Sequence, residues 1–349
     1  MNTEDQLRAA LDARLRAVDP GTIAPLVVPS RRRRAVWAVP VAASVVALVV
    51  VAAAVLGGIM NGSGSQDALS GGAPGYLVSV QDDGTAAVRD PSNGRRISSV
   101  PGGNYVAVAA GGHDTFYLAA RDGDCRVRLY ETSVRQEAIA AEPTPLPGGP
   151  YAISPDDVGL SAAPDGARLA VSGTCETTYK VAIVDTDTGA THQWTGYSTA
   201  SARYLPSWTA DGRALGVLWW DVRRDIAKAP LLMLDPNRSG DLADARVLRT
   251  MRIQDGPLKG ARIESIAFAP GGRSLTALVS GPPAVAVLSA TTGRPTGQVV
   301  RLPEDGAGML RLDRSGRHIL LIGSGRIGTL QGSHITWHTD PHEYRDAAW

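Results

Sequence analysis

The chain has 349 residues and a nearly balanced charge, with 35 basic and 34 acidic side chains. A chain with this balance has no overall attraction to nucleic acid, so we expect no nucleic-acid partner. The length allows one large all-β domain with smaller additions. The charge is unevenly placed, because residues 1–34 carry seven arginines and four acids whereas residues 35–60 carry no charge.

The first 34 residues are predicted to form a short cytoplasmic tail. Leucines recur at every fourth position at Leu7, Leu11 and Leu15, which is typical of an amphipathic helix over residues 3–18. Such a helix could dock on a cytoplasmic partner. It could also lie frayed on the membrane surface or in solvent, because isolated helices of this length are barely stable in water.

Residues 35–60 read AVWAVPVAASVVALVVVAAAVLGGIM and predict a transmembrane helix. A helix of this length extends about 39 Å, which exceeds the hydrocarbon core of about 30 Å. Four consecutive arginines precede it and favour a cytoplasmic N-terminus with the C-terminal domain outside. They are Arg31, Arg32, Arg33 and Arg34. The alternatives are a cleaved signal peptide, whose apolar region is usually shorter and nearer the start, and a buried core helix.

Residues 61–75 are predicted to be a flexible linker rich in Gly and Ser, and residues 76–338 repeat a unit of four strands. The clearest copies contain two apolar strands joined by a turn that ends in glycine: LSAAPDGARLAVSG, SWTADGRALGVLWW, AFAPGGRSLTALVS and LRLDRSGRHILLIG. Tight turns of this kind need a positive φ angle, which glycine adopts readily. The turn glycines are Gly166, Gly212, Gly272 and Gly316.

A second hairpin follows each copy, and four strands in about 40–60 residues is the period of a propeller blade. We therefore predict an all-β fold, a six-bladed β-propeller preceded by the transmembrane helix and the short N-terminal helix. The blades are expected near residues 76–100, 104–141, 158–195, 205–250, 263–302 and 308–338. The first copy is one strand short, so we expect one chain end to lend a strand that closes the ring. Seven blades, or an open pair of β-sandwiches, are the alternatives, and residues 339–349 are predicted to form a C-terminal tail.

The APDG and TADG turns, each followed by small and apolar residues, resemble the WD-like repeats of TolB-type propellers over most of residues 100–340. This resemblance implies a role in protein interaction. The tail and apolar segment resemble those of actinobacterial membrane proteins associated with sigma factors, although residues 1–34 lack the His and Cys of zinc-binding anti-sigma domains. The scarcity of lysine beside abundant Ala, Gly and Val also indicates a GC-rich, actinobacterial genome.

Cys125 and Cys175 are the only cysteines in the chain. Each falls in the loop between the second and third strands of its repeat, and the two repeats are adjacent. Equivalent loops of adjacent blades lie on the same rim, so we predict a disulfide, which an oxidising exterior permits. The alternative is a pair of free, buried thiols.

Three histidines near the C-terminus, His334, His338 and His342, are weak candidates for metal ligands. The first two share one face of a predicted strand but lie about 13 Å apart along it. We therefore predict no metal site. The chain also has no nucleophile turn, phosphate-binding loop or dinucleotide fingerprint, so we expect neither catalysis nor a cofactor.

The loop between the second and third strands of the fourth repeat is a candidate binding loop, because propeller loops of this kind carry function. It contains Trp219, Trp220, Asp221, Arg223 and Arg224. The alternative is a solvated charge cluster beside a core tryptophan.

Together these features predict a membrane-anchored, extracytoplasmic propeller that acts as a non-catalytic module for binding or sensing a protein or another ligand. The expected partners are the membrane through a single span, an unidentified extracytoplasmic protein or ligand, and a cytoplasmic protein at the tail. One alternative is a regulator associated with a sigma factor that acts through the tail. The other is an extracytoplasmic hydrolase or lyase with convergent His, Asp or Glu side chains at the propeller mouth.

Overall fold

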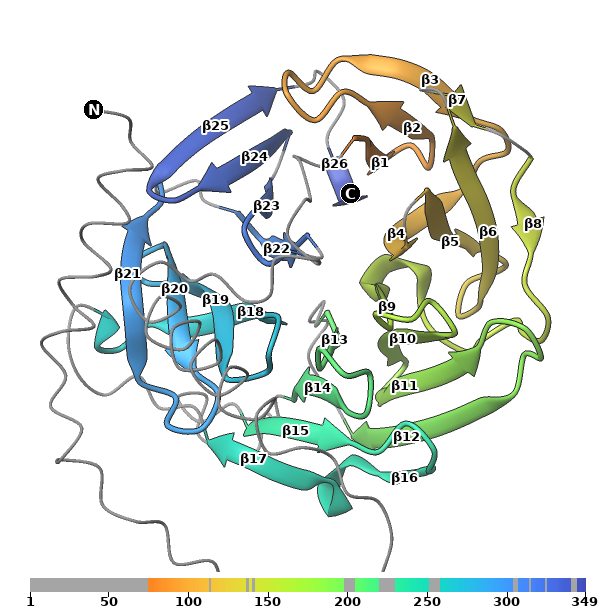
Figure 1. The fold of residues 1–349 in the computed structure, drawn as a ribbon. Helices are drawn as coiled ribbons and strands as arrows, with labels where there is room; N and C mark the ends of the chain where they lie inside the picture. The colour runs from red at the N-terminus through yellow and green to blue at the C-terminus, as the bar shows by residue number, and fades with distance from the viewer. Residues whose placement is uncertain are drawn as a thin grey trace, which may run out of the picture. The chain divides into compact units, whose positions relative to one another are not determined.

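The computed structural model describes residues 75–349 except 113, 136–137, 140–141, 198–204, 220–229, 251–257, 304–306, 314, 324 and 340–343. The described residues form a ring of six β-sheet blades (Figure 1). The predicted tail with its four arginines, the predicted transmembrane segment and the linker up to residue 74 lie outside the described residues. Among the residues that are described, no helix is long and apolar enough to cross a membrane.

The first strand of each blade lies nearest the axis of the ring, and the last strand lies at the outside (Figure 1). The first blade contains β26 (Tyr344–Ala348), β1 (Leu77–Gln81), β2 (Ala86–Arg89) and β3 (Arg96–Val100). The second contains β4 (Tyr105–Gly112), β5 (Thr115–Arg121), β6 (Val127–Arg135), β7 (Ala138–Ile139) and β8 (Thr144–Pro145). The third contains β9 (Gly159–Ala162), β10 (Arg168–Cys175), β11 (Thr178–Asp185) and β12 (Thr191–Tyr197).

The remaining three blades repeat this order. The fourth contains β13 (Ser207–Trp208), β14 (Leu215–Leu218), β15 (Pro230–Leu234) and β17 (Arg246–Thr250). Its β16 (Gly240–Asp241) reaches back and pairs in parallel with β12 of the third blade. The fifth contains β18 (Arg262–Phe268), β19 (Ser274–Ser280), β20 (Ala284–Ser289) and β21 (Pro295–Arg301). The sixth contains β22 (Met309–Leu312), β23 (Ile319–Gly323), β24 (Arg326–Gln331) and β25 (His334–Thr339), and the 3-10 helices are η3 (Pro155–Asp157) and η4 (Leu242–Asp244).

The predicted six-bladed propeller is confirmed, and each predicted blade coincides with a sheet of the ring. The predicted closure by a lent strand is also confirmed, because β26 pairs antiparallel with β1. The predicted boundary at residue 338 is wrong, since β26 lies within the residues 339–349 that were expected to form a tail. Tyr344, Ala347 and Ala348 are buried, so this segment packs into the ring as part of its core.

The core consists of apolar clusters between the faces of neighbouring blades. Middle strands such as β10 and β19 are buried along almost their whole length, because a blade covers each of their two faces. Outermost strands such as β25 are largely exposed. The clusters follow one another around the ring and include one between the last and the first blade, which contains Met309, Ile322, Leu77 and Ala347.

The four predicted turn glycines all have positive φ angles, as expected. The angles are +74° at Gly166, +64° at Gly212, +66° at Gly272 and +67° at Gly316. Each glycine ends the turn between the first and second strands of its blade. These turns all lie on one face of the ring, which we call the turn face.

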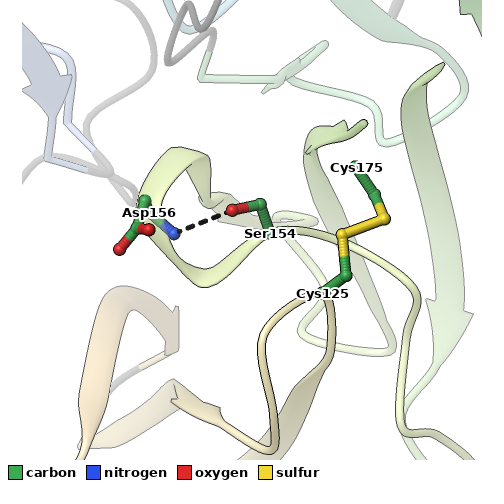
Figure 2. Close-up of a disulfide and its surroundings, with 4 residues drawn as sticks. All are labelled: Cys125, Ser154, Asp156 and Cys175. Carbon is green, nitrogen blue, oxygen red and sulfur yellow. Dashed lines mark hydrogen bonds between the residues drawn. A yellow bond between two sulfur atoms is a disulfide. The ribbon is translucent and has the colours of Figure 1, made fainter. Parts of the chain in front are cut away.

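The predicted disulfide is present between Cys125, in the loop after β5, and Cys175, at the end of β10 (Figure 2). Their Cα atoms are 5.7 Å apart. Loops between second and third strands lie on the face opposite the turns, so we call it the disulfide face. Close by, the Ser154 hydroxyl accepts a hydrogen bond from the Asp156 amide and begins η3 (Figure 2).

Two of the turn glycines form a matched pair for testing the turn geometry. A Cβ at Gly316 would lie 2.3 Å from Cδ of Pro270, whereas a Cβ at Gly272 would meet nothing within 4 Å. Gly272→Ala is therefore expected to cost only the positive φ angle, about 1–2 kcal/mol of unfolding free energy. Gly316→Ala should cost roughly 1–3 kcal/mol more because the turn must move. Chemical denaturation of both variants checks this, and equal losses would contradict the contact with Pro270.

The disulfide is expected to stabilise the propeller because it lowers the conformational entropy of the unfolded chain. The cysteines are 50 residues apart, so replacing both by serine should lower the free energy of unfolding by about 4 kcal/mol. Denaturation with and without reductant measures this effect. Reductant should destabilise the wild-type chain and leave the double variant unchanged. An unchanged wild type would show that the bridge does not form.

Candidate functional site

A pocket of about 370 Å³ lies on the axis of the propeller. Every blade contributes to it, through the end of its first strand and, in most blades, the turn that follows. The pocket therefore lies at the turn face. Most of the 22 lining residues are small or apolar, and only Arg311 and Asp313 have charged side chains.

Arg311 closes the inner end of this pocket. Its Nη2 donates to both carboxylate oxygens of Asp346, at 2.9 and 2.8 Å, and its Nε donates to Oδ1 at 3.2 Å. Its Nη1 donates to the Leu160 carbonyl at 2.9 Å. Because Arg311 belongs to the sixth blade and Leu160 to the third, the side chain crosses the axis. Asp346 and Leu160 do not line the pocket, which places the guanidinium between them and the pocket.

Asp346 connects three blades. It belongs to β26 of the first blade, binds Arg311 of the sixth, and accepts a hydrogen bond at 3.0 Å from the Val108 amide of the second. The two charged side chains are 12% and 3% exposed, so the ion pair is buried. A carboxylate that is bidentate to arginine and also accepts backbone amides satisfies the demands of a buried charge.

First strands have one edge that faces the axis, and side chains of the preceding blade bind the amides along it. Ser207 of the fourth blade accepts from the Phe268 amide of the fifth at 2.9 Å. Ser265 of the fifth accepts from the Leu310 amide of the sixth at 3.4 Å. An unpaired strand edge would otherwise expose donors to any competing chain. The walls of the pocket are therefore already partly saturated with hydrogen bonds.

The second charged lining residue, Asp313, is also fully engaged. Its Oδ2 lies 2.7 Å from Nδ1 of His318 and accepts the Ser315 hydroxyl at 2.6 Å. Its Oδ1 accepts the amides of Arg317 and His318 at 3.0 and 3.2 Å. The carboxylate is 9% exposed and orders the turn between β22 and β23.

Aromatic rings form part of the pocket wall, and side chains outside the pocket support them. The Arg168 guanidinium lies 5.3 Å from the centre of the Trp208 ring, and its Nη2 donates to the Gly212 carbonyl. His318 packs edge-on against Trp349, with the ring centres 6.1 Å apart. In both places a residue at the start of a second strand, or directly before it, contacts an aromatic ring of the next blade.

The disulfide face contains a separate group of charges. Asp156 accepts from Arg121 at 2.8 Å and lies 3.6 Å from Arg345. The hydrogen bond from Arg121 lowers the pKa of Asp156, and the positive charge of Arg345 acts in the same direction. Arg345 also donates to the Pro155 carbonyl at 2.6 Å. These contacts join β26 to η3.

The predicted binding loop is only partly described. Trp219 is 6% exposed and packs in the core between the third, fourth and fifth blades, so it is not part of a binding surface. This corrects the prediction for Trp219 and fits the alternative of a core tryptophan. Trp220, Asp221, Arg223 and Arg224 lie outside the described residues.

The histidine candidates do not come together in the described part of the chain. His334 and His338 lie four residues apart on β25, where they pair with Gln331 and Ile327 of β24. His338 packs against Gly94 of the first blade. His342 lies outside the described residues, and among those described no group of three or more His, Cys, Asp or Glu could hold a metal ion.

Sequence reasoning missed Arg311, although the repeat contains a signal for it. Arg311 precedes its turn glycine by five residues, and the three residues at the same distance from the other turn glycines are small. They are Ser161, Ser207 and Ala267. All four line the pocket, so one long side chain among small ones fills the axis. The sequence contains no comparable signal for its partner Asp346, which lies outside the repeats, in the segment that we expected to form a tail.

Comparison with known proteins identifies the fold. No family model matches the chain, and no curated protein sequence matches it. TolB from Acinetobacter baumannii has a similar structure, with a TM-score of 0.53 and 14% identity over 78% of this chain and 65% of that chain. The chain thus spans less than two thirds of that TolB. A chain of a nidogen–laminin complex gives a TM-score of 0.52 at 8% identity, over 78% of this chain and 97% of that chain.

A putative TolB from Agrobacterium tumefaciens gives a TM-score of 0.49 at 13% identity, over 78% of this chain and 92% of that chain. At these identities the likeness establishes the fold alone. The fold is a TolB-like, six-bladed β-propeller, as the turn motifs predicted.

Arg311 and Asp346 are expected to stabilise the ring only when both are present. Asp346→Asn keeps an acceptor for Val108 but leaves the buried guanidinium without a counter-charge, so it should lower the unfolding free energy by roughly 3–5 kcal/mol. The double variant Arg311→Met with Asp346→Asn should recover part of that loss. Chemical denaturation of the two single variants and the double variant measures the coupling. Additive losses would mean that the two side chains do not interact across the axis.

Proposed function

We propose that this chain is an actinobacterial single-pass membrane protein whose propeller lies outside the cytoplasm and acts as a non-catalytic binding module. The axial pocket at the turn face is the binding site in this proposal. The observation that carries the proposal is that all six blades contribute to one pocket that is mostly apolar and contains a few polar groups. Concave sites of about 300–1000 Å³ with this character are the usual places where proteins bind ligands.

The lining of the pocket favours binding over catalysis. A hydrolase or lyase would need His, Asp or Glu side chains that converge on a substrate and are not already engaged by other protein groups. Here Asp313 binds His318, Ser315 and two backbone amides, and Asp346 lies behind Arg311. Each carboxylate is therefore committed to holding the protein together.

The proposed location rests on two features. The disulfide between Cys125 and Cys175 is a bond that persists in oxidising compartments and is rare in the cytosol. The uncharged residues 35–60 with four arginines before them are typical of a span whose N-terminus is cytoplasmic. A sigma-factor-associated role for the tail stays an alternative from sequence, and no observation on the propeller favours it.

The topology and the binding site can be tested on the full-length chain in intact cells. Protease added outside should digest residues 75–349 and spare the tail. A photo-crosslinking residue at Ala210, which is exposed at the rim of the pocket, should form adducts with a partner. The same residue at Ala190, an exposed position in an outer turn of the third blade, is the control and should form several-fold fewer.

Protection of the propeller from external protease in intact cells, with cleavage after lysis, would overturn the location. Equal adduct formation at Ala210 and Ala190 would overturn the axial pocket as the binding site. The crosslink compares two positions in the same folded chain, so it reads out binding at the pocket independently of expression level.

A further inference from the structure

From the charges and hydrogen bonds of the axial pocket, we infer that its ligand is an uncharged, apolar segment of a protein partner, bound with backbone carbonyl groups near Arg311. This inference rests on the proposed binding function and specifies the ligand class for the same site. It excludes carboxylates, phosphates and ammonium groups as the part of the ligand that enters the pocket.

The first argument is the charge balance at the site. The pocket contains one positive and one negative side chain: Asp346 balances the charge of Arg311, and Ser315, His318 and two backbone amides already bind the carboxylate oxygens of Asp313. A charged ligand group would leave water without gaining an ionic side chain that is free of other contacts, which is costly in a partly buried site. An uncharged group meets no such penalty. The charge balance therefore selects neutral ligands.

The second argument is the inventory of remaining donors. The only acceptor of Arg311 Nη1 among the described residues is the Leu160 carbonyl, so one hydrogen on this nitrogen is left for a ligand acceptor. The Ser161 hydroxyl, which is partly exposed in the pocket, makes no hydrogen bond to a described residue. A peptide group offers an uncharged acceptor and an uncharged donor, which suits an arginine hydrogen and a hydroxyl.

The third argument is the shape and chemistry of the walls. Seven of the lining residues are alanines, and the wall also contains aromatic residues and prolines. These are Trp208, Phe268, Trp349, Pro164, Pro206 and Pro270. Aromatic-lined grooves bind extended, proline-rich peptide segments, and hydrophobic grooves bind the apolar faces of peptide segments. A volume of about 370 Å³ is enough for a few side chains and too small for a folded domain. The occupant is therefore a short segment that projects from a larger partner.

Three matched peptides test the inference on the full-length chain purified in detergent. The neutral probe is N-acetyl-Ala-Leu-Pro-Leu-Ala-amide, and the two charged probes replace its first leucine by Asp or by Lys. The chain is labelled with 5-fluorotryptophan, so that ¹⁹F spectra distinguish Trp208 and Trp349 in the pocket from Trp337 on the outermost strand of the sixth blade. The neutral peptide should shift the first two signals and bind at least ten-fold more tightly than either charged peptide.

A blocked pocket provides the matched control. Ala210→Trp places a large side chain at the exposed rim and should weaken binding of the neutral peptide at least ten-fold, with an unchanged melting temperature. Ala190→Trp, the same change in an outer turn, should bind as the wild type does. Equal or tighter binding of a charged peptide, shifts at Trp337 alone, or full binding by Ala210→Trp would each overturn the inference.

The result also separates this inference from the proposed function. Adducts at Ala210 in cells together with no selectivity among the three peptides would mean that the site binds a partner of another chemical class. Binding of N-acetyl-Leu-amide as tightly as the pentapeptide would point to a small apolar molecule and would overturn the peptide assignment. Failure of both the crosslink and the peptides would overturn the binding function itself.

Discussion

The ion pair between Arg311 and Asp346 is the contact on which the ring depends. A propeller closes only if its last and first blades join, and here the joining strand β26 comes from the far end of the described chain. Asp346 fixes that strand to the sixth blade through Arg311 and to the second blade through the Val108 amide. Arg311 continues across the axis to Leu160 of the third blade. One pair of side chains thus connects four of the six blades.

The same contacts specify the register of β26. The strand has a bulge at Arg345, because Asp346 pairs with Val80 and Tyr344 pairs with Gln81. A bulge redirects a side chain, and here Arg345 reaches the Pro155 carbonyl on the disulfide face. A slip of one residue would place either Arg345 or Ala347 opposite Arg311. The first arrangement sets two like charges together and the second leaves a buried charge unpaired, so both are strongly disfavoured.

The sequence predicted the parts of the fold in which local pattern and tertiary environment agree. Second and third strands are covered on both faces by neighbouring blades, so their sequences are almost unbroken apolar runs. The turn glycines mark where the second strands begin. The disulfide was predictable because equivalent loops of adjacent repeats must share a rim. These inferences need only the repeat and its geometry.

The site could not be predicted in the same way, because it depends on contacts between blades that are far apart in sequence. The strand YRDAA has two charges in five residues and no alternating apolar pattern, so it read as a tail. Its Asp346 becomes a core residue only when Arg311, 35 positions earlier, meets it on the axis. Arginine in a strand is ordinarily exposed, and only its unusual place among small residues of the repeat distinguishes Arg311.

Closing the ring with charges also restricts what the pocket can bind. A carboxylate that accepted the remaining Nη1 hydrogen of Arg311 would lie beside Asp346, whose negative charge already balances that arginine. It would either be repelled by Asp346 or compete with it for the guanidinium, and competition would act against closure of the ring, so both effects lower the affinity for an anion. A neutral ligand leaves the pair intact and adds contacts to a preformed site. The requirement that the ring stay closed and the selectivity of the pocket for uncharged groups thus have one physical cause, the commitment of Arg311 to Asp346.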